Sequence, residues 1–102
     1  MKVIVIVVKV EKFKPQPRAK IATDGAGWCC QAAIQLRNER GVFFHHTGYH
    51  PQEEGVVVSA IKEAMRTCPV LAGRNFEVDL SRIDGRLNTV QREELSNIGG
   101  KP

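Results

Sequence analysis

The amino-acid sequence predicts one α/β domain built on a mixed sheet. Residues 28–37 alternate apolar and polar side chains, as a half-buried strand does, and a turn and a second strand-like run follow. Residues 51–68 then carry apolar side chains at helical spacing. The length of 102 residues is that of one domain, and 42% hydrophobic and 25% charged residues are ordinary for a globular protein. We therefore expect a single domain over residues 1–102.

The first predicted strand covers residues 2–10, most of which are β-branched. Its apolar run is too short for a signal peptide or a bilayer span. The composition predicts a strand that is either buried on both faces or packed in an oligomer. Because Pro15 and Pro17 interrupt strand pairing, we expect residues 1–18 to form an extra N-terminal strand and a connector, and residues 19–98 to form the core.

Three strands are expected to open this core. They cover residues 19–24, 28–37 and 42–49, and the last two should pair antiparallel across the turn Asn38-Glu39-Arg40-Gly41.

A helix is predicted after these strands. Pro51 marks its start, and Glu53 and Glu54 lie in its first turn, where the helix dipole favours negative charge. It should end at about Thr67, before Pro69. After a loop at Val70 to Arg74, a strand over residues 75–81 and a helix over residues 87–98 complete the predicted order.

The excess positive charge is concentrated at the N-terminus. The first twenty residues hold six basic residues and one acidic residue, whereas the other 82 carry a net charge of −1. Such an arm suits contact with nucleic acid phosphates; the alternative is a solvated edge strand that lysines protect from aggregation.

The chain contains three cysteines, an odd number without the spacing of a disulfide framework. We expect reduced thiols and a cytoplasmic protein, with no membrane partner.

Asp24 follows a short apolar stretch and opens the glycine turn Gly25-Ala26-Gly27. A carboxylate at a strand end has a fixed direction, and the glycines allow close approach of a ligand. The alternative is that Asp24 only caps a turn, since Asp-Gly is a common turn dipeptide.

With these elements in place, the chain resembles the ribonuclease H-like family over about residues 19–89. That family has a three-strand meander, a helix, a fourth strand beside the first, and further helices. Thr23-Asp24-Gly25 is similar to its Thr-Asp-Gly at a strand end, and residues 27–34 are similar to its next strand, which contains Ala-Ala-Ile. Residues 78–84 resemble its Val-x-Leu-Ser pattern before an aspartate. The resemblance implies a ribonuclease H-like mixed sheet of meander, helix, strand and helix, here preceded by the extra strand.

The resemblance also implies that Asp24, Glu54 and Asp84 are catalytic and bind metal, with Glu53 as the alternative to Glu54. Two magnesium ions, Mg²⁺ (or Mn²⁺), about 3.5 to 4 Å apart would be held by these carboxylates for phosphodiester hydrolysis. Asp24 would bridge both ions. The substrates implied are RNA, DNA or an RNA/DNA hybrid.

The chain departs from the family pattern in several ways. The turn after the first aspartate is short, and the family's last carboxylate has no match, which leaves Glu93 or Glu94 on the final helix as substitutes. Each proposed ligand also has a structural alternative. The glutamates at 53 and 54 suit the helix dipole, and Asp84-Gly85 suits a turn.

A zinc site is a separate hypothesis. On a strand His46 and His50 face one way and His45 the other, so His46, His50 and one of two adjacent cysteines, Cys29 or Cys30, could converge. The spacing matches no specific zinc motif.

Taken together, the sequence predicts a protein that acts on nucleic acid, with a Mg²⁺-dependent endonuclease or ribonuclease as its most specific form. The alternative is a non-catalytic interaction subunit, such as a homodimer or other homo-oligomer that pairs through residues 2–10.

Overall fold

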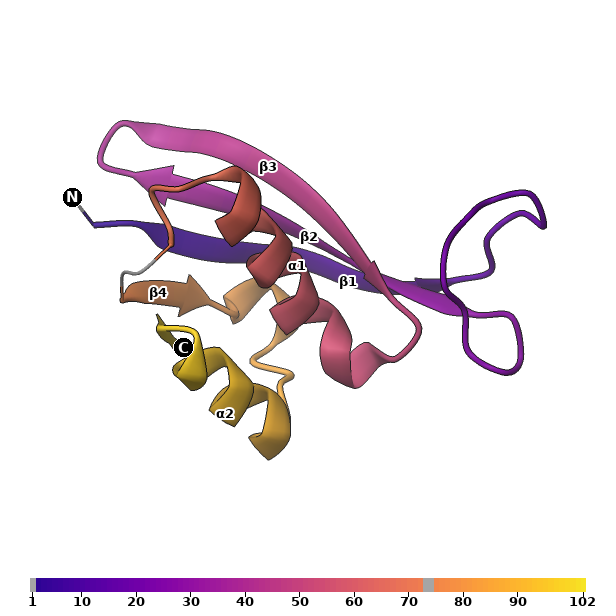
Figure 1. Ribbon diagram of the computed structural model, residues 1–102. Helices are drawn as coiled ribbons and strands as arrows, with labels where there is room; N and C mark the ends of the chain where they lie inside the picture. Colours follow the sequence, from indigo (N-terminus) through magenta and orange to yellow (C-terminus); the bar gives the residue numbers. More distant parts are fainter. Residues whose placement is uncertain (1, 73–74) are drawn as a thin grey trace.

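The structure, a computed structural model, describes residues 2–72 and 75–102. In chain order its elements are β1 (Ile4–Phe13), β2 (Cys29–Asn38), β3 (Gly41–His50), α1 (Glu53–Thr67), β4 (Phe76–Asp79), the 3₁₀ turn η1 (Ser81–Ile83), α2 (Thr89–Asn97) and β5 (Gly100–Lys101) (Figure 1). Among the described residues, one five-stranded sheet has the order β3-β2-β1-β4-β5. The β1–β2 and β2–β3 pairs are antiparallel, and β4 runs parallel to β1 and β5. The predicted α/β class with a mixed sheet is confirmed.

β1 lies at the centre of the sheet. Residues Ile4 to Ile6 pair with β2 on one side and with β4 on the other. Val5 and Val7 are fully buried beneath the helices, and Ile6, which faces the other way, is also buried. A β-branched run suits this position because it covers apolar surface on both faces. Since β2 and β4 already occupy both edges over residues 4–6, that part of β1 offers no free edge for the predicted pairing with a second chain.

The predicted strand over residues 19–24 is wrong, and so is the extra strand before the core. Residues 14–28 form a loop that projects beyond the sheet, and β1 itself is the first strand of the meander (Figure 1). Burial explains the difference. Ala22 and Thr23 are exposed, so this segment has no continuous apolar face to cover, whereas β1 has one.

The remaining predicted elements occur with small shifts. β2, β3 and α1 begin and end within two residues of their predicted limits. α2 begins after Asn88, whose side chain accepts a hydrogen bond from the Gln91 backbone while the Gln91 side chain accepts one from the Asn88 backbone. β4 is shorter than predicted, because Ser81 already belongs to η1, and β5 was not predicted. Of the predicted loop at Val70 to Arg74, residues 73 and 74 lie outside the described residues.

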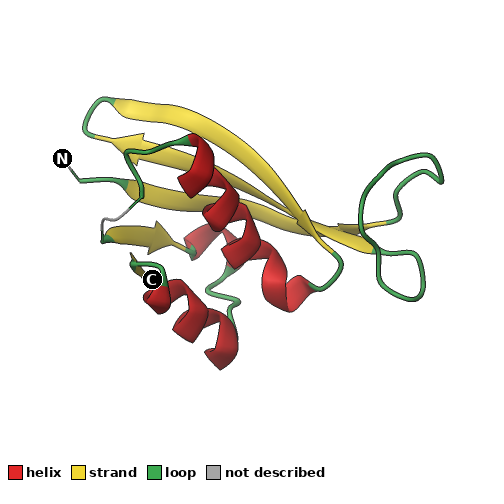
Figure 2. Cartoon of the chain, in the orientation of Figure 1, coloured by secondary structure: helices red, strands yellow, loops and turns green. Residues whose placement is uncertain are grey.

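Both helices cover the same face of the sheet (Figure 2). α1 crosses β3 closely, because a Cβ atom added at Gly48 would lie 2.6 Å from the Ala60 Cβ. α2 packs beside α1, and its Leu95 is buried near Gly100 of β5. Within the described residues, no helix is long and apolar enough to cross a membrane.

We call the opposite side of the sheet the open face, since neither α1 nor α2 packs on it. Successive strand residues point to alternate faces, and the pairing register identifies the side chains that share this one. Those of β1, β2 and β3 include Lys9, Glu11, Phe13, Gln31, Gln35, Arg37, His45, Thr47 and Tyr49.

Candidate nucleic-acid interface

Asp24 lies in the projecting loop and not at the end of a strand. Its Oδ1 accepts hydrogen bonds from the backbone N–H groups of Ala26 and Trp28, each at 2.9 Å. The Asp24 backbone N–H donates to the Trp28 carbonyl at 2.8 Å. These bonds close a turn over residues 24–28, so the interpretation of Asp24 as a turn cap is confirmed.

The hydrogen bond from the Trp28 backbone holds the pKa of Asp24 below its usual value, and nearby Lys12 acts in the same direction. A pKa that is lower in the folded state means that the ionised carboxylate stabilises the fold above the unfolded pKa of about 4, and that this contribution disappears as the pH falls through the folded pKa. We predict that Asp24→Asn lowers the melting temperature at neutral pH and that the difference from wild type narrows below about pH 4.

Circular dichroism melts from neutral to acidic pH measure this difference. Glu11 and Asp79, whose pKa values are also lowered, are present in both proteins, so their contributions cancel. A difference that stays constant or widens in acid would contradict the assigned role of the Asp24 carboxylate.

The other two predicted ligands lie on different elements. Glu54 is in the first turn of α1, and Asp84 follows η1 in the left-handed conformation, with φ of 55°. Across residues 2–72 and 75–102, no three His, Cys, Asp or Glu side chains form a group that could hold a metal ion. Asp24, Glu54 and Asp84 are therefore not brought together in such a group.

β4 ends at Asp79, so the aspartate at the end of this strand is Asp79 and not the predicted Asp84. Sequence reasoning placed the strand end too late and passed over this residue. The Asp79 carboxylate accepts hydrogen bonds from the backbone N–H and the hydroxyl of Ser81, at 2.9 and 2.6 Å, which hold its pKa below the usual value. These bonds give Asp79 a structural role in the turn into η1.

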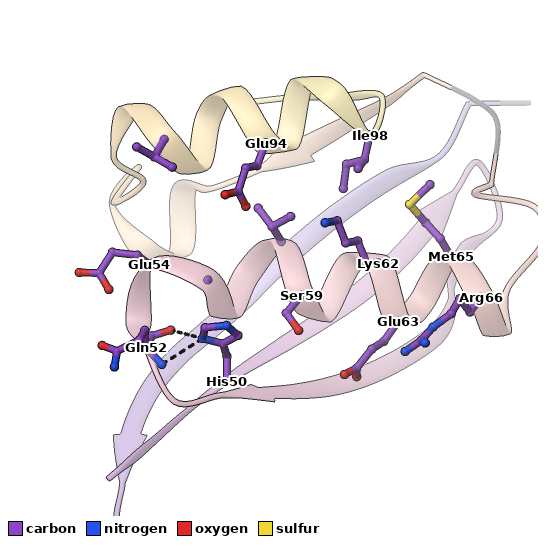
Figure 3. A pocket seen from close by; sticks show the side chains of 13 residues that line it. His50, Gln52, Glu54, Ser59, Lys62, Glu63, Met65, Arg66, Glu94 and Ile98 are labelled. Carbon is purple, nitrogen blue, oxygen red and sulfur yellow. Dashed lines mark hydrogen bonds between the residues drawn. The ribbon is translucent and has the colours of Figure 1, made fainter. Parts of the chain in front are cut away.

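A groove of about 860 Å³ runs between α1 and α2 (Figure 3). Glu54 and Glu94 contribute to it from the two helices, and Lys62 and Arg66 lie further along α1. Its walls are largely apolar, with Val58 buried in α1. Glu94, one of the two predicted substitutes for a last carboxylate, therefore lines the same groove as Glu54, whereas Asp24 lies in the projecting loop.

The basic residues of the N-terminal segment meet an aromatic ring where β1 leaves the sheet. The ammonium groups of Lys12 and Lys14 lie over the Trp28 ring, 5.7 and 5.8 Å from its centroid. Both distances are within the range of a cation–π contact. Trp28 remains 37% exposed, so the ring is accessible. We call Lys12, Lys14 and Trp28 the tip site.

Two further cations lie in the same loop, Arg18 and Lys20. Among the described residues, neither these two nor Lys12 and Lys14 form an ion pair with a carboxylate, whereas Lys9 pairs with Glu11 at 3.1 Å. Four cations that lack a close carboxylate partner produce a positive potential at this end of the molecule.

A second aromatic pair lies on the open face, at the same end of the sheet as the tip site. Phe13 of β1 and Tyr49 of β3 meet edge to face, with ring centroids 6.0 Å apart, and Tyr49 is 42% exposed. The sequence signal for these sites was weak, since Phe13, Trp28 and Tyr49 lie far apart in the chain and only the meander brings them to one end.

The histidines and cysteines have other partners. His46 Nε2 lies 2.8 Å from Glu63 of α1, and His50 accepts a hydrogen bond from the Gln52 backbone. Cys29 and Cys30 are buried, and burial raises the pKa of the Cys30 thiol, which disfavours the thiolate that would bind zinc. The His46–Glu63 contact joins β3 to α1, and the hydrogen bond between Gln52 and His50 fixes the start of α1.

No family model matches the chain, and comparisons with curated proteins and with solved structures give no significant match.

Proposed function

We propose that this protein binds nucleic acid through the tip site and the projecting loop. The observation that carries the proposal is the exposed Trp28 ring beneath two lysine ammonium groups. Lysines bind phosphates through charge, and an exposed indole stacks on a base. The combination supplies both contacts that a nucleotide offers within one site.

Charge alone would suit many acidic partners, so the aromatic ring is the discriminating feature. A phosphate that approaches Lys12 and Lys14 would draw the ammonium groups outward and leave a face of Trp28 free for a base. Arg18 and Lys20 extend the positive surface along the loop, where they would contact neighbouring phosphates.

We predict that Lys12→Ala/Lys14→Ala weakens binding of a labelled oligonucleotide and makes the affinity less dependent on salt. Each lost phosphate contact should reduce the slope of log affinity against log salt by about 0.7 for a single strand, so two lost contacts should reduce it by about 1.4. Fluorescence anisotropy over a salt series measures both quantities.

The matched control is Lys62→Ala/Arg66→Ala, which removes two positive charges from α1. The tip proposal requires this control to keep most of the wild-type affinity and slope. Equal losses in the two double variants would assign binding to net charge, and the absence of any binding by the wild type would reject the proposed function.

The strand order favours a ribonuclease H-like fold, and the nuclease activity that this resemblance implies is the second candidate function. The meander β1–β2–β3 is followed by α1 and by β4 beside β1, which is the arrangement that the family resemblance implies. The described carboxylates do not fit a bound metal pair, since Asp24, Glu54 and Asp84 form no common group. We therefore propose the family fold for this chain and assign no cleavage step to these three carboxylates.

Cleavage of labelled RNA, DNA and RNA/DNA hybrid with Mg²⁺ or Mn²⁺ tests this second candidate. Wild type and Asp24→Asn should be compared at a temperature at which both are folded, because Asp24 also closes the turn at the tip. Metal-dependent cleavage that Asp24→Asn abolishes would support the nuclease, whereas binding without cleavage would leave the binding function alone.

A further inference from the structure

The open face of the sheet carries exposed aromatic and polar side chains in a regular array. Along β3 the exposed residues His45, Thr47 and Tyr49 alternate with residues that face α1. Near the start of β3 the register shifts between Leu36 and Arg37, which places Val42 and Phe43 together opposite Arg37. Phe43 is 41% exposed, and so two accessible rings, Phe43 and Tyr49, lie near opposite ends of this edge strand.

The six residue steps from Phe43 to Tyr49 correspond to about 20 Å along the strand. Between and beside the rings lie hydrogen-bonding side chains from β2, Gln31 and Gln35. The acid on this part of the face, Glu11, is already engaged by Lys9 at 3.1 Å and by the Gln31 side chain at 2.9 Å.

Positive charge lies at both ends of this array. The tip site lies at the same end of the sheet as Phe13 and Tyr49, but on the other face, because Lys12 pairs with Cys30 and points to the helix-covered side whereas Phe13 points to the open face. At the other end Arg37 and Arg40 line a hollow of about 500 Å³ beside the turn between β2 and β3. Rings and amides thus lie between two basic ends, which complements a chain of bases with phosphates on both sides.

From this arrangement we propose that the open face is a platform for single-stranded nucleic acid, which stacks bases on Tyr49 and Phe43 and passes around the end of the sheet to the tip site on the other side. The proposal rests on the proposed function and deepens it by naming the substrate class. Stacking on protein rings requires unpaired bases, whereas a duplex hides its base faces and offers mainly phosphates. The tip lysines alone would bind either form, so preference for a single strand has to come from the rings.

The test compares an oligothymidine or oligouridine single strand with a hairpin duplex of equal phosphate number, at fixed salt. We expect tighter binding of the single strand. Phe43→Ala and Tyr49→Ala should each weaken single-strand binding by roughly 5- to 100-fold and change hairpin binding little. Tyr49→Phe should keep close to the wild-type affinity that Tyr49→Ala loses, because the ring is kept. Val90→Ala, at an exposed apolar position on α2, should have no effect on binding.

Trp28 gives an independent signal, since it is the single tryptophan of the chain. Its fluorescence reports the tip site, so quenching should persist in Phe43→Ala at saturating oligonucleotide. Circular dichroism confirms that each variant is folded. Single-stranded DNA and RNA offer similar base faces for stacking. The affinities of the oligothymidine and the oligouridine therefore show which of the two nucleic acids the platform binds.

Two results would overturn the inference. Equal affinity for strand and hairpin, with Phe43→Ala and Tyr49→Ala both neutral but Lys12→Ala/Lys14→Ala still harmful, would leave binding at the tip and remove the platform. Absence of binding and of Trp28 quenching with every probe would reject the proposed function together with the inference.

Discussion

Replacing Gly48 by alanine should destabilise the protein by about 3 kcal/mol, near the upper end of the usual cost of overpacking. A Cβ at this position would lie 2.6 Å from the Ala60 Cβ and 2.7 Å from the Ala60 Cα. Both neighbours belong to the α1 backbone or are fixed to it, so a side-chain rotation cannot relieve the clash. β3 and α1 would have to separate, which would open the core along their whole contact.

Chemical denaturation of Gly48→Ala and Gly25→Ala measures the effect. Gly25 is the matched control, because a Cβ there meets no heavy atom within 4 Å and the residue lies in the exposed loop. Equal stability of the two variants would contradict the close packing of β3 on α1. Ala60→Gly combined with Gly48→Ala should recover part of the loss, since it removes one of the two clashing atoms.

Truncating Ile61 to alanine is the second change with a large expected effect. Ile61 is fully buried on the face of α1 that packs on the sheet, so its loss removes apolar contacts and leaves a cavity. We expect the free energy of unfolding to fall by about 2 to 5 kcal/mol, and by about 0.5 to 1.5 kcal/mol for Ile61→Val.

Lys62→Ala is the control for this series, because the neighbouring lysine is exposed. Urea denaturation should rank the proteins as wild type close to Lys62→Ala, then Ile61→Val, then Ile61→Ala. A small cost for Ile61→Ala would mean that α1 is not anchored to the sheet by this side chain.

The sequence predicted the meander and the helices where the apolar pattern was strong. β2, β3 and α1 are placed well because period-two alternation and helical spacing are local properties. The prediction for residues 19–24 was wrong because the short apolar stretch that ends at Asp24 was interpreted as a strand, although it has no continuous apolar face to bury. An aspartate followed by glycine describes a turn as well as a strand end, and the hydrogen bonds of Asp24 show the turn.

The candidate site was harder to predict from the sequence than the fold. Six basic residues in the first twenty were recognised as a possible contact for phosphates, but the pattern was weak because Phe13 is the single aromatic residue among them. Trp28 and Tyr49 reach the same end of the molecule only through the antiparallel register of β1, β2 and β3. No local pattern in the chain contains that register.

The sequence by itself determined the α/β class with a mixed sheet and the excess of positive charge near the N-terminus. For the β-branched run over residues 3–8 it left two possibilities open, a strand buried on both faces and a strand packed in an oligomer. Only the tertiary structure decided which strand opens the meander, that Asp24 closes a turn, and that two lysines lie over Trp28. The physical reason is that burial and helix periodicity act between near neighbours in the chain, whereas a binding site depends on the three-dimensional placement of residues that are distant in sequence.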